Sequence, residues 1–281
     1  MKIFELQQQL AKFIAENPGN FIEQSYAISP EYVGTPIFET PLIGCAAADD
    51  SLFEYMKQNQ EVYGPTLRLP NEWLSGAKSV VSFFLPFSKE IRDSNRSDLT
   101  RPSDLWLHGR IEGQKFLDCV TVYLAELLQK EGGKVIIPSQ NEDFFVLRDP
   151  ARSLENKPPY VSNWSERHAA FVAGLGTFSL SKHLITEKGV CGRFSSVITT
   201  LPLEITQRDY TDPFEYCTFC GACRRRCLVN AIGTTDKNNV LCSDFQKQTK
   251  ERFLPRFGCG KCQLSVPCET GRPKMKKSKT D

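Results

Sequence analysis

Four cysteines lie within eleven residues of this chain, and their spacing restricts its possible structures more than any other feature of the sequence. The segment CTFCGACRRRCLVN, residues 217–230, has the pattern C-x2-C-x2-C-x3-C. Three thiolates at two-residue intervals are typical ligands of one [4Fe–4S] cluster, and a fourth cysteine three residues later is typical of a ligand to a second cluster. Zinc sites, the alternative, more often use two well-separated C-x2-C pairs.

The remaining cysteines can complete a second cluster. The chain has eleven cysteines, and eight of them lie between residues 217 and 268. In two-cluster ferredoxins the fourth cysteine of each run ligates the other cluster. That crossed pattern assigns Cys217, Cys220, Cys223 and Cys268 to cluster one, and Cys227, Cys242, Cys259 and Cys262 to cluster two. The second run is irregular, with C-x2-C-x5-C, and Leu228 stands where the ferredoxin pattern has proline.

The other three cysteines, Cys45, Cys119 and Cys191, are scattered through the first 200 residues. We expect them to be packing thiols, with Cys191 a candidate for lining the site. Disulfides are disfavoured in reducing compartments, so a dense thiol cluster there more often binds metal.

Composition and charge exclude several classes of protein. Hydrophobic residues make up 40% of the 281 residues and charged residues 24%, as in ordinary globular domains. The net charge of +2 gives no strong field for attracting nucleic acid or an anionic membrane. No apolar run approaches the roughly 20 residues of a membrane helix, and the N-terminal segment has no secretory pattern. We therefore expect a cytoplasmic protein with no membrane partner.

Hydrophobic periodicity divides the chain into two domains and a tail. Residues 1–210 predict an α+β domain, a sheet with covering helices. Its expected helices end near Asn17, lie within 103–133 and span 163–176, the last capped by Ser162 or Asn163 and closed by Gly174. Its expected strands lie within 74–87, 134–138 and 192–204, and its loops at 92–104 and 147–160. Residues 211–270 have little apolar material, so cluster ligation must supply much of their folding energy. Residues 271–281 form a basic tail.

Several segments, in order, resemble the epoxyqueuosine reductases and the related reductive dehalogenases. They are AKSVVSFFLPFS, WLHGRIEGQ, ERHAAFVAGLGTFSLSKHLIT, GRFSSVITTLPL and the cysteine segments that end in FGCGKCQLSVPCE. The resemblance implies a nitroreductase-like cobalamin-binding domain followed by a ferredoxin-like module with two [4Fe–4S] clusters. It also implies that the clusters pass electrons to a base-off corrinoid (cobalamin), which reduces a substrate. A reduced ferredoxin or flavodoxin would be the donor, and the arginines at 224–226 either dock it or raise the nearby cluster's potential.

The same resemblance implies roles for individual residues. The family's acidic proton donor is missing, and Tyr160 takes its approximate place as a possible general acid. Glu166 is set aside because it lies too close to the helix that follows. The other implied site residues are His108 and Arg110 as catalytic groups, and Gly174, Leu175, Gly176, Phe194, Ser195, Ser196 and Val197 as corrinoid contacts. Ordinary alternatives are a buried structural tyrosine, a satisfied core histidine, a helix C-terminus and a core strand.

One departure from the family affects the expected substrate. Many epoxyqueuosine reductases carry a helical-repeat domain after the clusters that helps to hold tRNA, and this chain ends about 13 residues after Cys268. A small-molecule substrate is therefore expected in preference to tRNA. The alternatives are an epoxyqueuosine reductase acting on tRNA, or an electron-transfer protein with flavin or with no N-terminal cofactor.

Overall fold

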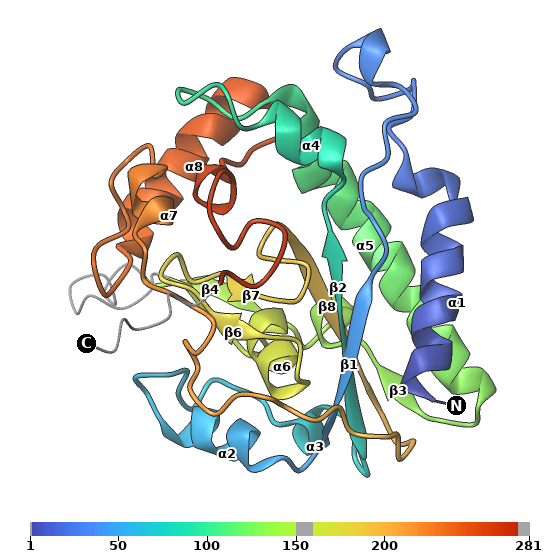
Figure 1. The fold of residues 1–281 in the computed structure, drawn as a ribbon. Coiled ribbons are helices and arrows are strands. Elements are labelled where there is room, and N and C mark those ends of the chain that lie inside the picture. The colour runs from blue at the N-terminus through green and yellow to red at the C-terminus, as the bar shows by residue number, and fades with distance from the viewer. Residues whose placement is uncertain (1, 150–159, 275–281) are drawn as a thin grey trace.

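A four-stranded antiparallel sheet forms the centre of the molecule (Figure 1). The structure, a computed structural model, describes residues 2–149 and 160–274. The strands follow the order β1-β2-β8-β3. They are β1 (Leu42–Ala47), β2 (Ser79–Pro86), β8 (Gly192–Thr199) and β3 (Val135–Ile136). Strand β2 pairs with both β1 and β8, so that Val81 lies opposite Cys45 on one side and Val197 on the other.

Strand β2 is central because its sequence, SVVSFFLP, tolerates burial on both faces. All eight of its residues are buried. β-branched and aromatic side chains favour such a position, and its two serines are hydrogen-bonded: Ser79 Oγ donates to the Leu201 carbonyl and Ser82 Oγ to the Ser195 carbonyl. The strand predicted within residues 74–87 is confirmed.

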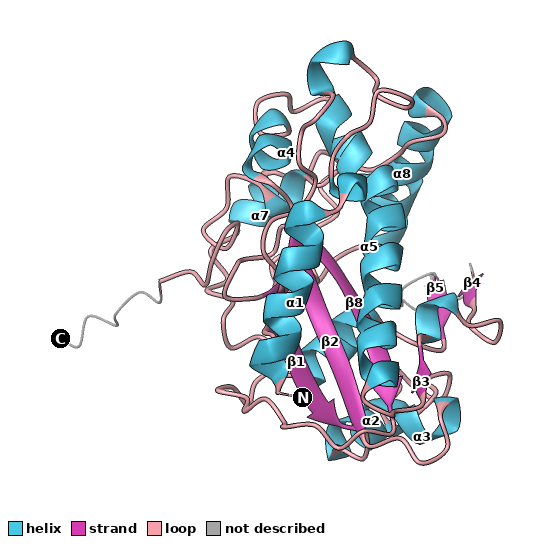
Figure 2. Ribbon diagram, turned by 90° about the vertical axis from the view of Figure 1, so that its right-hand side faces the viewer, coloured by secondary structure: helices cyan, strands magenta, loops and turns pink. Residues whose placement is uncertain are grey.

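Two long helices cover one face of the sheet, as Figure 2 shows. Helix α1 (Ile3–Glu16) buries Leu6, Leu10 and Ile14, and helix α5 (Asp104–Lys130) buries an apolar stripe that includes Val120 and Leu124. The Ser103 hydroxyl caps α5 by accepting a hydrogen bond from the backbone N–H of Trp106. Both predicted helices are confirmed, and neither they nor any other described helix is long and apolar enough to cross a bilayer.

Helices α6 (Glu166–Val172), α2 (Ser51–Gln58) and α3 (Pro70–Trp73) pack on the opposite face. Helix α6 begins three residues later than predicted, after Ser165, so neither Ser162 nor Asn163 caps it. The Asn163 side chain instead accepts a hydrogen bond from the Phe145 N–H and donates one to the Asp143 carbonyl. These bonds attach a ribbon of two strands, β4 (Val146–Arg148) and β5 (Tyr160–Ser162). The loop predicted at 147–160 is therefore bounded by strands, and its middle lies outside the described residues.

The outer edge of β1 is occupied by a segment from much later in the chain. The backbone N–H of Cys45 donates to Thr206 Oγ1 (3.0 Å), and the backbone N–H of Thr206 donates to the Cys45 carbonyl (2.9 Å). At the opposite edge, β3 is only two residues long.

The cysteine segment lies beside this sheet domain and contains mostly short elements. These are α7 (Ala222–Arg225), α8 (Asn239–Phe253) and a 3-10 turn (Lys261–Gln263). Only two residues of α8, Ser243 and Thr249, are buried. The thin apolar core predicted for this segment is observed: its buried hydrophobic residues are Ala222, Ala231, Ile232, Leu264 and Val266.

Helix α4 (Lys89–Ser94) packs against α5. Because α4 ends at Ser94, the loop predicted at 92–104 starts only at Asn95. The remaining elements are the hairpin of β6 (Thr177–Phe178) and β7 (Leu184–Ile185), and 3-10 turns at Pro18–Asn20, Pro30–Tyr32 and Pro138–Gln140. Most of the predicted tail, residues 275–281, lies outside the described residues.

Polar contacts hold the cysteine segment against the sheet domain. Arg256 donates to Glu112 of α5, with Nε 3.1 Å from Oε2, and Lys261 Nζ donates to Asn95 Oδ1 at 2.7 Å. Gly260 has a φ of +69°, and a Cβ there would lie 1.8 Å from the Trp106 ring. Only glycine fits between the cysteines at this close approach.

Candidate functional site

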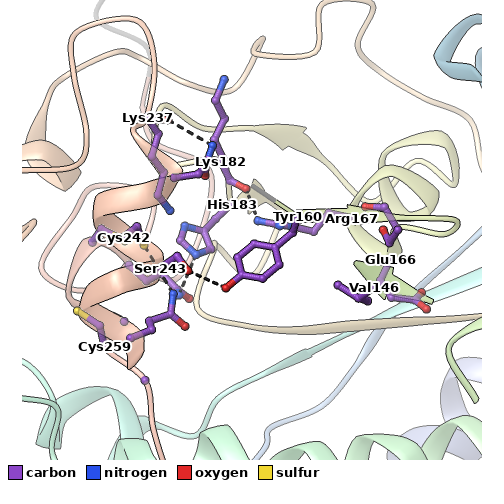
Figure 3. Close-up of a pocket in the computed structure, with 18 of the residues that line it drawn as sticks. Val146, Tyr160, Glu166, Arg167, Lys182, His183, Lys237, Cys242, Ser243 and Cys259 are labelled. Carbon is purple, nitrogen blue, oxygen red and sulfur yellow. Dashed lines mark hydrogen bonds between the residues drawn. The ribbon is translucent and has the colours of Figure 1, made fainter. Parts of the chain in front are cut away.

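A cavity of about 1070 Å³ lies between the sheet domain and the cysteine segment. Its walls come from α5, the β5–α6 region, β8, α8 and the turn at Gly258–Gln263. Figure 3 shows part of it, with Cys242 and Cys259 on one side, Arg167 and Glu166 on the other, and His183 and Tyr160 between them. Pockets for drug-sized ligands usually measure about 300–1,000 Å³. The space is therefore large enough for a macrocyclic cofactor.

The eight clustered cysteines separate into two groups of four. The large cavity is lined by Cys227, Cys242, Cys259 and Cys262. A much smaller second cavity is lined by Cys217, Cys220, Cys223 and Cys268. The electrostatic neighbours divide in the same way: the thiol of Cys262 interacts with the other three of the first group, and that of Cys268 with the other three of the second. The two groups coincide with the two predicted ligand sets, and ligation itself stays a prediction.

The protein environment makes these thiols costly to ionise without metal. Burial, together with the neighbouring thiols, raises the pKa of both Cys262 and Cys268 to about 12. Iron would offset that charge, because a thiolate bound to a metal is no longer an uncompensated anion. The Ala231 N–H also donates to Cys227 Sγ at 3.2 Å, the kind of contact that tunes cluster potentials. Among the described residues, no group of three His, Cys, Asp or Glu side chains could hold a single metal ion.

The three remaining cysteines lie apart from both cavities. Cys45 and Cys191 are buried in the apolar core, as predicted for packing thiols, and Cys191 lines neither cavity. Cys119 is exposed on α5, so the prediction that it packs in the interior is wrong. Its position on the outer surface of an amphipathic helix explains the difference.

Tyr160 and Arg110 both face the large cavity. The Tyr160 side chain points toward α8, where its hydroxyl lies 2.7 Å from Ser243 Oγ (Figure 3). Its exposed fraction is 44%, so it is not a buried structural tyrosine. The Arg110 guanidinium lies over the Phe257 ring, 4.9 Å from its centroid, and burial lowers its pKa.

His108 lies away from the cavity in the apolar core. It is fully buried on α5, and its Nε2 accepts a hydrogen bond from the Ile28 N–H. Its Nδ1 therefore carries the proton and donates to Glu112 Oε2 at 3.0 Å. This is the satisfied core histidine that the sequence left as an alternative.

The residues predicted to contact the corrinoid divide between cavity and core. Phe194 lines the cavity and packs against Phe84. The next three residues of β8, at 195–197, are buried behind it. Gly174 and Gly176 follow α6, and a Cβ on Gly176 would lie 1.9 Å from the Ile185 carbonyl oxygen. Close packing accounts for these glycines, and neither they nor Leu175 line the cavity.

Glu166 is the principal cavity residue that the sequence analysis set aside. Its Oε2 accepts a 2.6 Å hydrogen bond from Ser196 Oγ, while its Oε1 is buried with no partner among the described residues. Burial raises the pKa of Glu166 to about 7, and the hydrogen bond from Ser196 opposes that rise. Ser196, predicted as a cofactor contact, thus acts by holding Glu166.

Two histidines also line the cavity in their neutral forms. Burial lowers the pKa of His168 to about 3, and it lowers that of His183 well below its usual range. His183 Nε2 lies 3.1 Å from Gln263 Nε2, and its Nδ1 lies 2.9 Å from Ser181 Oγ. The segment ERHAAFVAGLGTFSLSKH contains both histidines, but only its folding around β6 and β7 brings them to one cavity.

Solved structures share this arrangement of elements. An epoxyqueuosine reductase with a tRNA-Tyr stem loop matches at a TM-score of 0.54 and 18% identity, covering 97% of this chain and 68% of its own. The enzyme from Streptococcus thermophilus matches at 0.54 and 17%, covering 98% and 69%. A catabolic reductive dehalogenase in complex with 3-bromo-4-hydroxybenzoic acid matches at 0.51 and 14%, covering 96% and 37%.

The chain has the fold of the epoxyqueuosine reductases and reductive dehalogenases. The likeness predicted from sequence segments is therefore confirmed at the level of the fold. It spans well under half of the dehalogenase. No family model and no curated protein matches the sequence.

The residues of this epoxyqueuosine reductase fold suit the cofactors that the likeness implies. Eight thiols in two sets of four are the donor type that iron–sulfur clusters require. The large cavity has aromatic walls at Trp106, Phe194 and Phe257. Gln263 Oε1 on its wall, like Glu166 Oε1, is buried with no partner among the described residues. A corrinoid has a flat apolar body and an amide rim, so it could satisfy both kinds of surface.

Proposed function

We propose that this chain is an oxidoreductase in which two [4Fe–4S] clusters and a base-off corrinoid serve the reduction of a substrate in the large cavity. One observation carries the proposal. The eight thiols lie in two sets of four, and one set lines a cavity large enough for a macrocycle. The likeness of fold to epoxyqueuosine reductases and reductive dehalogenases supports it.

The positions of the cysteines suggest the direction of electron flow. The set at the small cavity, Cys217, Cys220, Cys223 and Cys268, would hold cluster one and receive electrons. The set at the large cavity, Cys227, Cys242, Cys259 and Cys262, would hold cluster two and deliver them. Arg224 and Arg225 are exposed beside Cys223 and offer a positive surface to an acidic ferredoxin or flavodoxin. Arg226 is engaged in the fold, since its Nη2 donates to the Arg96 carbonyl.

A corrinoid, when bound, supplies the reducing chemistry, and the chain supplies placement and protons. Two side chains can deliver a proton to the cavity. The Tyr160 hydroxyl lies at its wall beside Ser243. The Glu166 carboxyl, with a pKa of about 7, is partly protonated at neutral pH, and its unpartnered Oε1 is where that proton can reside.

The proposed substrate is a small molecule rather than tRNA. A net charge of +2 provides little of the electrostatic attraction on which nucleic-acid binding depends. Binding of an epoxyqueuosine-modified stem loop at low salt, lost as salt rises, would instead favour the tRNA alternative.

The decisive experiment is anaerobic purification from cells supplied with cobalamin. The proposal predicts about eight irons per chain and near-stoichiometric corrinoid, measured by absorbance and mass spectrometry. Flavin, or clusters without corrinoid, would refute the corrinoid and favour an electron-transfer protein. Cys217→Ser and Cys242→Ser should each remove about half of the iron and abolish a different cluster signal.

The proton donors can be separated with a reducible probe such as 3-bromo-4-hydroxybenzoic acid. Tyr160→Phe and Glu166→Gln should each be measured for turnover and for cofactor content. Loss of turnover at full cofactor content identifies the donor. Tyr55→Phe, at an exposed tyrosine of α2, is the matched control and should turn over normally.

A further inference from the structure

Three arginines from three different elements line the large cavity. Arg110 comes from α5, Arg167 from α6 and Arg193 from β8. They are electrostatic neighbours of like charge, because Arg167 lowers the pKa of Arg110, and Arg110 lowers that of Arg193. Partial burial lowers the pKa of Arg110 and of Arg193, that of Arg193 to about 9, whereas Arg167 is exposed.

Within the described part of the chain, none of the three guanidinium groups forms an ion pair with a carboxylate. Arg193 Nη1 reaches only the Arg110 carbonyl (3.4 Å), and its Nε is buried with no partner. Arg167 Nη1 donates to the Lys182 carbonyl at 2.6 Å. Asp118, the acid that raises the pKa of Arg193, is connected to it only through Gln114, which accepts from Arg193 and donates to Asp118.

The rest of the cavity wall adds to this positive charge. Four lysines line it, Lys182, Lys237, Lys247 and Lys250, whereas its only acidic side chains in the described residues are Glu61 and Glu166. Arg167 and Lys250 are exposed and the other cations are partly buried, but like charges gathered around one cavity repel one another unless something of the opposite sign accompanies them. The excess positive charge therefore indicates an anionic occupant.

Cluster two can account for only one of the arginines. A loaded cluster carries thiolate charge, and Cys242 is an electrostatic neighbour of Arg167. No cysteine is an electrostatic neighbour of Arg110 or Arg193 in the described residues. These two arginines lie on the side of the cavity formed by α5 and β8, and their charge is left for another ligand.

We propose that Arg110 and Arg193, with Arg167 beside them, bind an anionic group of the substrate: a carboxylate, phenolate or phosphate. The inference rests on the proposed function in taking this cavity as the substrate site. Guanidinium groups suit such oxyanions because they present parallel N–H donors. The phosphate in the nucleotide loop of cobalamin has the same chemistry, so the experiment must separate the two sources.

The test is calorimetric titration of the anaerobically purified holoprotein with benzoate and with benzamide, its neutral isostere. We expect benzoate to bind and benzamide not to bind. Arg110→Gln and Arg193→Gln should each weaken benzoate binding about tenfold, the loss expected for one charge-assisted contact. The affinity of Arg110→Lys for benzoate should lie between those of the unaltered protein and Arg110→Gln, because lysine keeps the charge but loses the parallel N–H donors of the guanidinium group. Lys115→Gln, at an exposed cation on the same helix, should leave binding unchanged.

Several outcomes would overturn the inference. Equal binding of benzoate and benzamide, or unchanged binding in both glutamine variants, would show that the arginines recognise no anion. Benzoate binding to protein loaded with cobinamide, which lacks the nucleotide loop, but not to protein loaded with cobalamin, would assign the site to the cofactor's phosphate. Iron and corrinoid contents measured on the same samples test the proposed function separately. A failure of the proposed function can therefore be distinguished from a failure of the anion-binding inference.

Discussion

Strand β2 and helix α8 differ in how much of their surface is buried. All eight residues of β2 are buried, whereas only two of the fifteen residues of α8 are, and both of those are polar. The sheet domain is stabilised by removing apolar surface from water. The cysteine segment has little such surface. Polar contacts attach it to the sheet domain, and the proposed clusters would supply the remaining stabilisation. The two regions should therefore respond differently to the same kinds of damage.

Loss of a cluster ligand should have the largest effect, and only in the cysteine segment. Cys242→Ser is expected to lower the iron content by about half and to open residues 228–257 to proteolysis, because the proposed ligation would supply much of the folding energy there. Limited proteolysis with mass spectrometry should show the sheet domain surviving as a resistant fragment. Cys119→Ser, at an exposed thiol outside both sets, is the control. Simultaneous collapse of both regions would contradict the comparison.

Removing a buried side chain from the sheet should instead lower global stability and leave the iron content unchanged. Phe83→Ala removes a fully buried ring from β2 and should lower the free energy of unfolding by about 3–5 kcal/mol. Denaturant titration measures this change, and iron per folded chain should stay constant. Phe4→Ala, at a ring of α1 that is 67% exposed, should cost no more than about 0.5 kcal/mol.

The contact between Arg256 and Glu112 joins the two regions, so its loss should affect both. Both side chains are largely buried, and Arg256→Gln leaves the Glu112 carboxylate without its cation. The expected cost is about 3 kcal/mol in the free energy of unfolding. Arg256→Lys should recover part of it. If the variant lost iron without losing global stability, the contact would belong to the cysteine segment alone.

Glu166, at the cavity between the two regions, should make a smaller, pH-dependent contribution to the free energy of unfolding. Its pKa rises from 4.5 to about 7 on folding, so the folded state binds the proton more tightly than the unfolded state. Stability from this group is therefore present below pH 4.5 and is lost as the pH rises toward 7. The stability of Glu166→Gln, measured by thermal unfolding, should decline less than that of the unaltered protein between pH 5 and 7.5, by roughly 2 kcal/mol. The lowered pKa values of His168 and His183 make stability rise with pH, but they do so equally in the unaltered protein and in Glu166→Gln. Parallel plots of stability against pH for the two proteins would therefore exclude a contribution from Glu166.

The sequence predicts those parts of the fold whose side chains follow a period. Strand β2 and helices α1 and α5 have apolar residues at strand or helix spacing, and they occur where expected. Helix α8 was not predicted because it has no apolar face and so no periodic signal. The start of α6 was misplaced because Asn163, a good capping residue, is used by the β4–β5 ribbon instead.

The candidate site follows a similar division. The grouping of the cysteines into two sets of four could be predicted from their spacing along the chain, and their ligation of clusters stays a prediction. The sequence argues against Glu166 as the proton donor because it lies close to the helix that follows. Its position beside Ser196 instead depends on how α6 packs against β8. Arg193 likewise meets Arg110 only in the folded sheet domain.

The pairing of Thr206 with Cys45 has a consequence for how the protein behaves in concentrated solution. An open sheet edge offers unpaired N–H and C=O groups to strands of other chains and so promotes aggregation. In this molecule the outer edge of β1 is already hydrogen-bonded by Thr206, and the opposite edge strand, β3, is only two residues long. The backbone N–H and C=O of Cys45, in the middle of the edge strand β1, are thus unavailable to a strand of another chain.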